Sequence, residues 1–108
     1  MMKKQGRLSK KTILKVLEKH NLHHDRIILF GSRARGDQTK DSDWDILLII
    51  KGEIDREEER ILFKEITKML AKYLIPCDLL IRTIQEVDMF KNYVCSVTKT
   101  ALKEGISL

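Results

Sequence analysis

The chain has 108 residues, a mass of 12.7 kDa and a formal net charge of +5. This length supports a sizeable core and is too short for two domains, so we expect a single domain over residues 1–108. A hydrophobic content of 43% beside 34% charged residues excludes a disordered chain. No apolar run approaches the roughly 20 residues that cross a bilayer, and no signal peptide is apparent, so we expect no membrane association and a cytoplasmic location.

Positive charge is concentrated before residue 20. The lysine and arginine side chains there are Lys3, Lys4, Arg7, Lys10, Lys11, Lys15 and Lys19. Such a segment can bind nucleic acid or an acidic partner, or it can be the solvated face of a helix. No aromatic residue is interleaved with these lysines, so direct nucleic-acid binding is possible but is not favoured.

The first predicted element is a helix over residues 9–22. Its apolar residues recur at helical spacing, with Ser9 as a plausible N-cap and Asn21 as a residue that can end the helix. Three histidines follow closely, namely His20, His23 and His24. A metal site and a polar loop are both compatible with them, and the loop is favoured because no acid or cysteine of suitable spacing joins them.

Two apolar strands flank a turn that is rich in arginine. Residues 27–30 predict a short buried strand, after which Gly31 and Ser32 turn the chain. Ser32 can cap a single helical turn, and Gly36 can end it. Residues 44–50 are apolar on both faces, which predicts a central strand.

A long helix and a third strand are predicted next. Asp55 and Glu58 have the spacing of a capping box at the start of the helix. Pro76 is tolerated at a strand start or in an edge strand, and residues 77–81 predict that strand.

The end of the chain predicts a helical region and a short strand. Thr83 and Glu86 repeat the capping-box spacing before a helical region of roughly 84–104, which can break near Asn92. Gly105 ends this region, and residues 106–108 can form a terminal strand. The order of elements predicts an α/β (α+β) fold in which helices pack on a small mixed sheet, mainly on one face.

Two common phosphate-binding motifs and one kind of metal site are excluded by the sequence. Neither a GxGxxG fingerprint nor a Walker phosphate loop occurs. The two cysteines, Cys77 and Cys95, are isolated, which excludes a cysteine-rich zinc framework. Reduced core thiols are favoured over a disulfide between them.

Three aspartates are the candidate metal ligands and catalytic residues. Side chains alternate across a strand, so Asp43 and Asp45 point to one face about 7 Å apart along the chain. Asp78 stands near the start of the third strand and joins them if that strand pairs beside the second. Three carboxylates without histidine or thiolate suit Mg²⁺ or Mn²⁺, and two such ions can bracket a phosphoryl transfer.

The turn between the strands supplies candidate phosphate-binding groups. Gly31 lets the backbone approach a phosphate closely, and Ser32 offers a hydroxyl and a helix-start amide. Arg33 or Arg35 could neutralise charge on the phosphates. The structural alternative is that Asp43 is a loop acid and that Asp45 caps a turn, but the combined pattern is far more specific than either feature alone.

The same residues carry a resemblance to a known family. Gly31-Ser32, ten intervening residues and then Asp43-Trp44-Asp45 resemble the signature of the polymerase-β-like nucleotidyltransferase superfamily. The string GSRARGDQTKDSDWDILL resembles its minimal nucleotidyltransferase branch, and the similarity extends from the first helix through CDLLI to the terminal EGISL.

That resemblance implies a nucleotidyltransferase fold that uses an NTP and Mg²⁺ and releases pyrophosphate. It makes Asp43 and Asp45 metal ligands, and Asp78 the third acid and the base for an acceptor hydroxyl. Gly31 and Ser32 would hold the triphosphate. Trp44 replaces a residue that is commonly aliphatic in the family, and we expect it to face away from the metals.

The branch also resembles the antitoxin of two-gene toxin–antitoxin pairs, whose partner is a helical HEPN ribonuclease. The resemblance implies transfer of AMP from ATP to a tyrosine of that toxin, within a hetero-oligomer. A short chain without a second substrate-binding domain is consistent with an acceptor that brings its own binding surface. Two alternatives remain open: neutralisation of the partner by occlusion, and nucleotide transfer to a small molecule or an RNA end.

Overall fold

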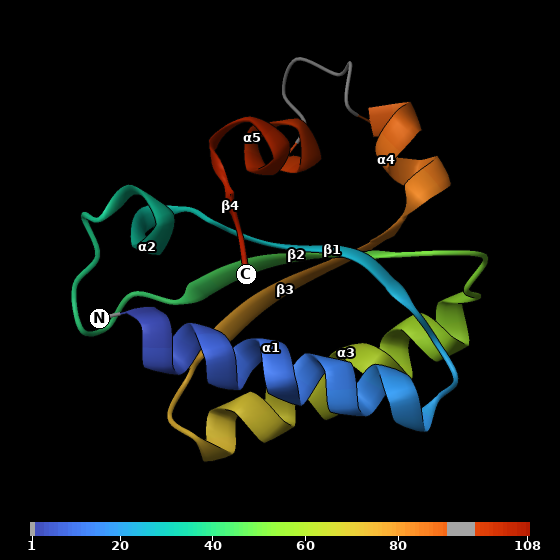
Figure 1. Ribbon diagram of the computed structural model, residues 1–108, viewed down its shortest axis with the longest axis horizontal. Helices are drawn as coiled ribbons and strands as arrows, with labels where there is room; N and C mark the ends of the chain where they lie inside the picture. The colour runs from blue at the N-terminus through green and yellow to red at the C-terminus, as the bar shows by residue number, and fades with distance from the viewer. Residues whose placement is uncertain (1, 91–96) are drawn as a thin grey trace.

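The computed structural model describes residues 2–90 and 97–108, which form a four-stranded mixed sheet with helices on both faces (Figure 1). The strands are β1 (His24–Phe30), β2 (Trp44–Ile50), β3 (Cys77–Thr83) and β4 (Ile106–Ser107), in the spatial order β3-β2-β1-β4. β1 runs antiparallel to both β2 and β4, whereas β3 runs parallel to β2. The central position predicted for residues 44–50 is therefore confirmed.

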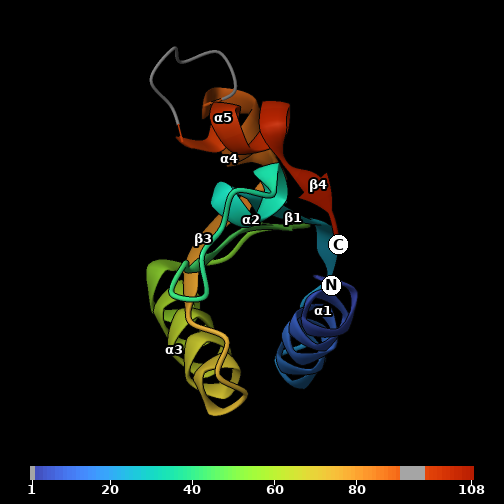
Figure 2. The same ribbon diagram turned by 90° about the vertical axis from the view of Figure 1, so that its left-hand side faces the viewer.

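The helices divide unequally between the two faces of the sheet. They are α1 (Met2–Lys19), α2 (Ser32–Arg35), α3 (Arg56–Lys72), α4 (Ile84–Phe90) and α5 (Val97–Glu104). Figure 2 shows α1 and α3 together on one face and the shorter α4 and α5 on the other. This confirms the predicted class, a small mixed sheet with most of its helical structure on one face. Across the described residues, no helix is both long enough and apolar enough to cross a bilayer.

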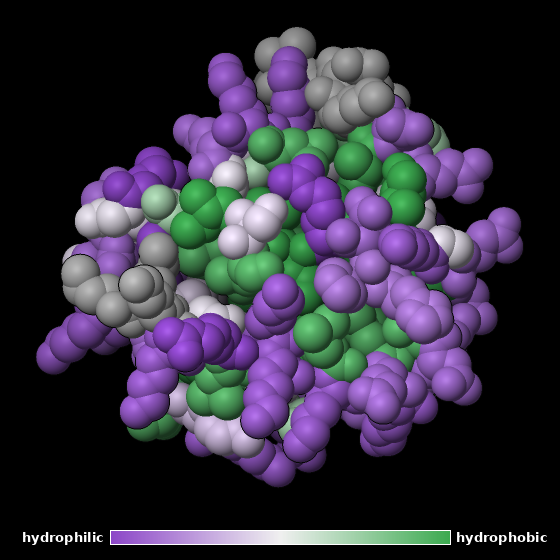
Figure 3. Space-filling view, in the orientation of Figure 1, coloured by the Kyte–Doolittle hydropathy of each residue, from purple (hydrophilic) through white to green (hydrophobic). Residues whose placement is uncertain are grey.

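β2 is buried on both faces because its side chains alternate between two cores. Ile46 and Leu48 pack with α1 and α3 in the larger core, and both are 0% exposed. Leu47 and Ile49 lie in the smaller core, together with Ala101 of α5. The face drawn in Figure 3 is mainly hydrophilic, with apolar side chains grouped near the sheet and α5.

The ends of α1 and β1 differ from the predictions. α1 begins at Met2, and Ser9 is a fully buried residue inside the helix instead of its N-cap. Small residues such as Gly6 continue the buried stripe toward the N-terminus, which a search for large apolar side chains misses. β1 begins at His24, not residue 27, because its polar start still pairs with the end of β2, with His24 opposite Ile50.

Both predicted helix starts in the second half are confirmed. The Asp55 side chain accepts a hydrogen bond from the Glu58 amide at 2.8 Å. At the start of α4, the Thr83 amide donates to Glu86 Oε1 at 2.9 Å, and the Glu86 amide donates to Thr83 Oγ1 at 3.1 Å. The predicted break near Asn92, and Cys95, lie outside the described residues.

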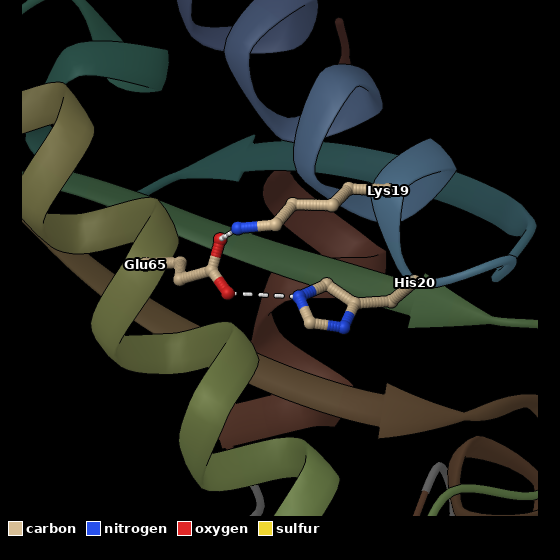
Figure 4. A network of polar contacts seen from close by, with 3 residues as sticks. All are labelled: Lys19, His20 and Glu65. Carbon is tan, nitrogen blue, oxygen red and sulfur yellow. Dashed lines mark hydrogen bonds and ion pairs between the residues drawn. The ribbon is translucent and has the colours of Figure 1, made fainter.

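A polar clamp joins the two long helices and accounts for one of the clustered histidines. His20 Nε2 lies 2.8 Å from Glu65 Oε1, and Lys19 Nζ lies 3.1 Å from Glu65 Oε2 (Figure 4). The pKa of Glu65 is lowered by its hydrogen bonds to His20 and then to Lys19. His20 therefore ties α1 to α3.

Candidate active site

The topology brings the three predicted acids to one end of the sheet and one face of it. In the parallel pair β2–β3, Asp45 stands directly opposite Asp78, and Asp43 immediately precedes β2. Side chains alternate along each strand, so Asp45 shares a face with Leu47, and Asp78 shares it with Leu80. Leu47 and Leu80 both belong to the smaller core. The acids therefore lie on the α4–α5 side, where β2 and β3 begin.

Trp44 alternates with the acids and points to the other face. Its side chain is 0% exposed within the larger core beneath α1 and α3. Its amide donates to the carbonyl of Pro76 at 2.8 Å, which aligns the starts of β2 and β3. The tryptophan thus faces away from the acids that are the candidate metal ligands.

The end of β1 completes this edge of the sheet. Phe30 pairs with Asp45, and Gly31 follows with a φ of 76°. A Cβ atom placed on Gly31 would lie 2.1 Å from Asp45 Oδ2, so the carboxylate sits against bare backbone. Glycine is required here for its positive φ and for this close approach.

The charges of Asp43 and Asp78 act on Asp45. The pKa of Asp45 is raised first by burial, then by the charges of Asp78 and Asp43, while Arg35 opposes the shift. None of the ion pairs found among the described residues involves these acids. Within the same residues, no group of three or more histidine, cysteine or acidic side chains is already arranged to hold a metal ion. The geometry thus supplies a shared face and neighbouring charge, while metal binding itself stays a prediction.

Cys77 immediately precedes Asp78 on β3. Burial, followed by the charges of Asp78, Asp45 and Asp43, raises the pKa of its thiol to about 12. The thiol therefore stays protonated at neutral pH in the metal-free chain, and Cys77 packs against the larger core, on the face of the sheet opposite the acids. It is a free thiol, as predicted.

The turn after β1 is built differently from the prediction in one respect. Gly31 is the N-cap of α2 without a side-chain hydrogen bond, and Ser32 is the first helical residue. The predicted capping role of Ser32 was therefore wrong, because Gly31 takes the non-helical position. Gly36 ends the turn in the left-handed conformation, as predicted, and its amide donates to Ser32 O at 2.9 Å.

The two arginines of the turn lie in different environments. Arg33 donates two hydrogen bonds to the carbonyl of Ser42, at 3.1 and 2.9 Å, and its guanidinium lies 4.9 Å from the centre of the Trp44 ring. It thus braces the loop directly before Asp43. Arg35 is exposed and pairs with Asp37 at 3.3 Å. Arg35 also acts electrostatically on Asp45, so it is the better placed of the two to meet substrate charge.

The bracing role of Arg33 is the feature that sequence reasoning missed. Arginine beside glycine and serine suggests an anion-binding group, and no local pattern shows that the guanidinium is held by a loop carbonyl. Its contact with Trp44 depends on how that ring packs against the far face of the sheet.

Comparisons with known proteins agree with this geometry. The family model for a nucleotidyltransferase domain matches residues 10–107. Two curated relatives come from Methanocaldococcus jannaschii. "Putative protein adenylyltransferase MJ0141" is 42% identical over 60 residues, which is 56% of this chain and 57% of that protein. "Putative protein adenylyltransferase MJ0604" is 35% identical over 80 residues, which is 74% of this chain and 73% of that protein.

Two solved structures share the fold. One is described as the crystal structure of a toxin-antitoxin with AMP-PNP; it has a TM-score of 0.57 and 23% identity over 90% of this chain and 69% of that one. The other is described as a "putative nucleotidyltransferase" from Sulfolobus solfataricus; it has a TM-score of 0.53 and 23% identity over 94% of this chain and 76% of that one. The first of the two curated relatives is matched over little more than half of its own length. The chain belongs to the nucleotidyltransferase domain family, which confirms the family that the sequence predicted.

Proposed function

We propose that this chain is a Mg²⁺-dependent protein adenylyltransferase. It transfers AMP from ATP to a tyrosine of a cognate HEPN ribonuclease toxin and so acts as an antitoxin. The observation that carries the proposal is the placement of Asp45 opposite Asp78, with Asp43 on the same face and Gly31 against the Asp45 carboxylate.

The chemistry of the donor set fits a hard divalent cation. Asp43, Asp45 and Asp78 offer oxygen donors, and the pKa of Asp45 is raised first by burial and then by the negative charges of Asp78 and Asp43. A cation held by these acids would relieve that repulsion, and Mg²⁺ is preferred to Zn²⁺ because no histidine or available thiolate joins them. When bound, Mg²⁺ supplies neutralisation of the charge on the triphosphate.

The remaining site residues bind either the phosphates of ATP or the acceptor hydroxyl. The backbone at Gly31 and the Ser32 hydroxyl hold the triphosphate, and Arg35 meets part of its charge. Asp78 is exposed at the start of the edge strand β3, where an acceptor hydroxyl can reach it from solvent. Its carboxylate accepts the hydroxyl proton while the acceptor oxygen bonds to the α-phosphorus. The bond from that phosphorus to pyrophosphate breaks.

The nature of the acceptor and partner rests on the comparisons. Both curated relatives are named as protein adenylyltransferases, and one structural neighbour is a toxin-antitoxin structure with an ATP analogue. Asp43 and Asp78 are both exposed, which suits an acceptor that is part of a large molecule. These points favour protein over RNA ends or small molecules, and ATP over other nucleotides.

The test uses the double variant Asp43→Asn with Asp45→Asn and, as a matched control, Asp41→Asn. Asp41 is an exposed acid two residues before the site, so the control makes the same chemical change outside it. Each protein is incubated with Mg²⁺, the product of the neighbouring gene and ATP labelled on its α-phosphate. We expect labelled protein with wild type and control, and a loss of at least about 100-fold in the double variant.

Three other outcomes would contradict parts of this proposal. If the double variant still protects cells from the toxin as well as wild type, neutralisation occurs by occlusion. If label appears on RNA or a small molecule but never on protein, the chain is a nucleotidyltransferase with another acceptor. Mapping the labelled residue to something other than tyrosine would refute the acceptor assignment.

A further inference from the structure

The two long helices end in the same hydrogen-bonding motif. At the end of α1, the Leu22 amide donates to Leu17 O at 2.9 Å. At the end of α3, the Ile75 amide donates to Leu70 O at the same distance. The residue before each of these donors bonds back to its own helix at 3.1 and 3.0 Å, respectively. Both ends are therefore Schellman motifs, in which one residue adopts the left-handed conformation.

The residues in that left-handed position are chemically different. In α1 it is Asn21, with a φ of 56°, and in α3 it is Leu74, with a φ of 62°. Asparagine tolerates this conformation, whereas a leucine side chain crowds its own backbone there. The α3 end thus carries a less favourable residue for the same turn.

Leu74 gains no compensating burial inside the protein. Its side chain is 85% exposed, while Ile75, the next residue, is fully buried in the larger core. Tyr73 is also exposed, at 51%. A strained apolar residue in water is explained if another molecule covers it, because the turn then presents its side chain outward for contact.

Tyr73 and Leu74 stand close to the candidate active site. Leu74 precedes Asp78 by four residues, which is at most about 14 Å of extended chain. The intervening Pro76 is fixed to the site by its hydrogen bond from Trp44, at 2.8 Å. The end of α3 lies at the left of Figure 1, the same side as α2, and Figure 2 looks onto this side. A protein that reaches Asp78 would therefore meet this turn within one ordinary interface.

The charge beside the turn indicates what kind of protein could cover it. Lys64, Lys68 and Lys72 are exposed and recur every four residues, so they form one stripe along α3 that ends beside Tyr73. None of them takes part in the ion pairs found among the described residues. An apolar tip beside a row of free ammonium groups is complementary to an apolar pocket bordered by carboxylates.

We propose that Tyr73, Leu74 and this lysine stripe form the docking surface for the protein acceptor, which presents an apolar pocket with an acidic rim. The inference rests on the proposed function, because its occupant is the protein that receives the nucleotide. A protein docked at Leu74 would reach Asp78 around the start of β3, because α3 lies on the opposite face of the sheet from the acids (Figure 2) and at most about 14 Å of extended chain separates the two residues. The surface thereby selects the acceptor without taking part in the transfer.

The test compares Leu74→Asn, Leu74→Met and the control Met89→Gln. Asparagine suits the left-handed turn but removes the apolar contact, whereas methionine keeps the contact. Met89 is a 60% exposed apolar residue on α4, which follows the opposite end of β3. The probe is the product of the neighbouring gene, used in binding titrations and in steady-state transfer of α-labelled ATP.

For Leu74→Asn we expect a melting temperature about 4 °C above wild type. We also expect at least about tenfold weaker binding to the probe and a matching rise in its KM, with kcat retained. Leu74→Met and Met89→Gln should bind as wild type does. The double variant Lys68→Glu with Lys72→Glu should also bind the probe more weakly than wild type. This loss of affinity should be larger at low salt than at high salt.

Four results would overturn the proposal. The first is that Leu74→Asn leaves binding and KM unchanged, and the second is that Met89→Gln loses as much affinity for the probe as Leu74→Asn does. The third is a melting temperature of Leu74→Asn below that of wild type. The fourth is that the wild-type chain forms a dimer with itself and that Leu74→Asn dissociates this dimer. Absence of transfer by the wild-type protein is a separate result, because it refutes the proposed function before the docking surface is tested.

Discussion

Replacing Gly31 with alanine tests how the candidate site is assembled. The new Cβ atom would lie 2.1 Å from Asp45 Oδ2 and 3.0 Å from Asp45 Cγ. Non-bonded carbon contacts are comfortable only at about 3.5 Å, so the carboxylate must move by roughly 1 Å or more. The substitution therefore displaces a predicted metal ligand without changing any acid.

The expected effects on stability and on activity differ in size. With a φ of 76° and a ψ of −157°, Gly31 adopts a conformation that is essentially restricted to glycine, so an L-residue there costs about 1–3 kcal/mol, and this cost falls on folding. A misplacement of about 1 Å in a catalytic group can reduce the rate about 100-fold. We therefore expect Gly31→Ala to remain folded while losing about two orders of magnitude in nucleotide transfer.

Gly52→Ala is the matched control for this variant. Gly52 also has a positive φ, 84°, and a Cβ atom there would meet nothing within 4 Å. It follows the far end of β2, away from the acids. Both variants thus carry backbone strain, and Gly31→Ala alone carries the collision with Asp45.

The assay is the initial rate of transfer from α-labelled ATP, alongside thermal unfolding of each protein. We expect Gly31→Ala to lose more stability than Gly52→Ala, because only Gly31→Ala adds the collision with Asp45, and we expect a loss of transfer confined to Gly31→Ala. Equal transfer rates in the two variants would refute the reasoning, because they would show that the position of Asp45 against Gly31 does not matter for activity.

Three further predictions concern the acids and the packing. The pKa of Asp45 is raised in the folded protein above its usual value of 3.8. At a pH above 3.8, ionised Asp45 therefore disfavours the folded state. Without divalent ions, Asp45→Asn should melt above wild type at neutral pH, and this difference should vanish below about pH 3; a lower melting temperature at pH 7 would contradict this. The pKa of Glu65 is lowered by His20, so its contribution exists above the usual value of 4.5 and disappears as the pH falls through the lowered value. Glu65→Gln should reduce the free energy of unfolding by about 0.5 kcal/mol at pH 7 in denaturant titrations, and an unchanged value would show that the clamp is thermodynamically neutral. Gly105→Ala should reduce it by about 2 kcal/mol, because the new Cβ would lie 2.2 Å from Ile28 Cγ2; full stability would mean that α5 can shift freely.

Local patterns were sufficient to predict the elements that surround the site. The apolar run of β2, the capping residues of α3 and α4, and the alternation of Asp43, Trp44 and Asp45 all follow from chemistry within a few residues. These predictions succeed because the stabilising groups are neighbours in sequence. Gly31 belongs with them, since a glycine between a strand and a polar turn already suggests a special backbone conformation.

The sequence predicts that Asp78 lies beside Asp45 only if the third strand pairs with the second. The residues are 33 positions apart, and whether β3 pairs beside β2 depends on how α3 crosses the sheet. The role of Arg33 is likewise non-local, because it depends on the path of the loop to Ser42 and on the buried ring of Trp44. The early start of α1 was missed for a related reason, because Gly6 and Ser9 are buried by packing against residues that are distant in sequence. Their burial reflects close packing and not apolar character.

Within the three residues Asp43, Trp44 and Asp45, the two acids are the candidate catalytic groups and the tryptophan stabilises the fold. Trp44 enters the larger core, which is formed mainly with α1 and α3, while the acids point to the opposite face. Carboxylates that repel one another disfavour folding, so a site of this kind needs compensation from elsewhere in the structure. The fully buried face beneath the two long helices supplies that compensation without approaching the reacting groups. Under the proposed function, we therefore expect substitutions among the acids to abolish transfer while preserving or raising stability. Truncating Trp44 should instead unfold the edge on which all three acids depend.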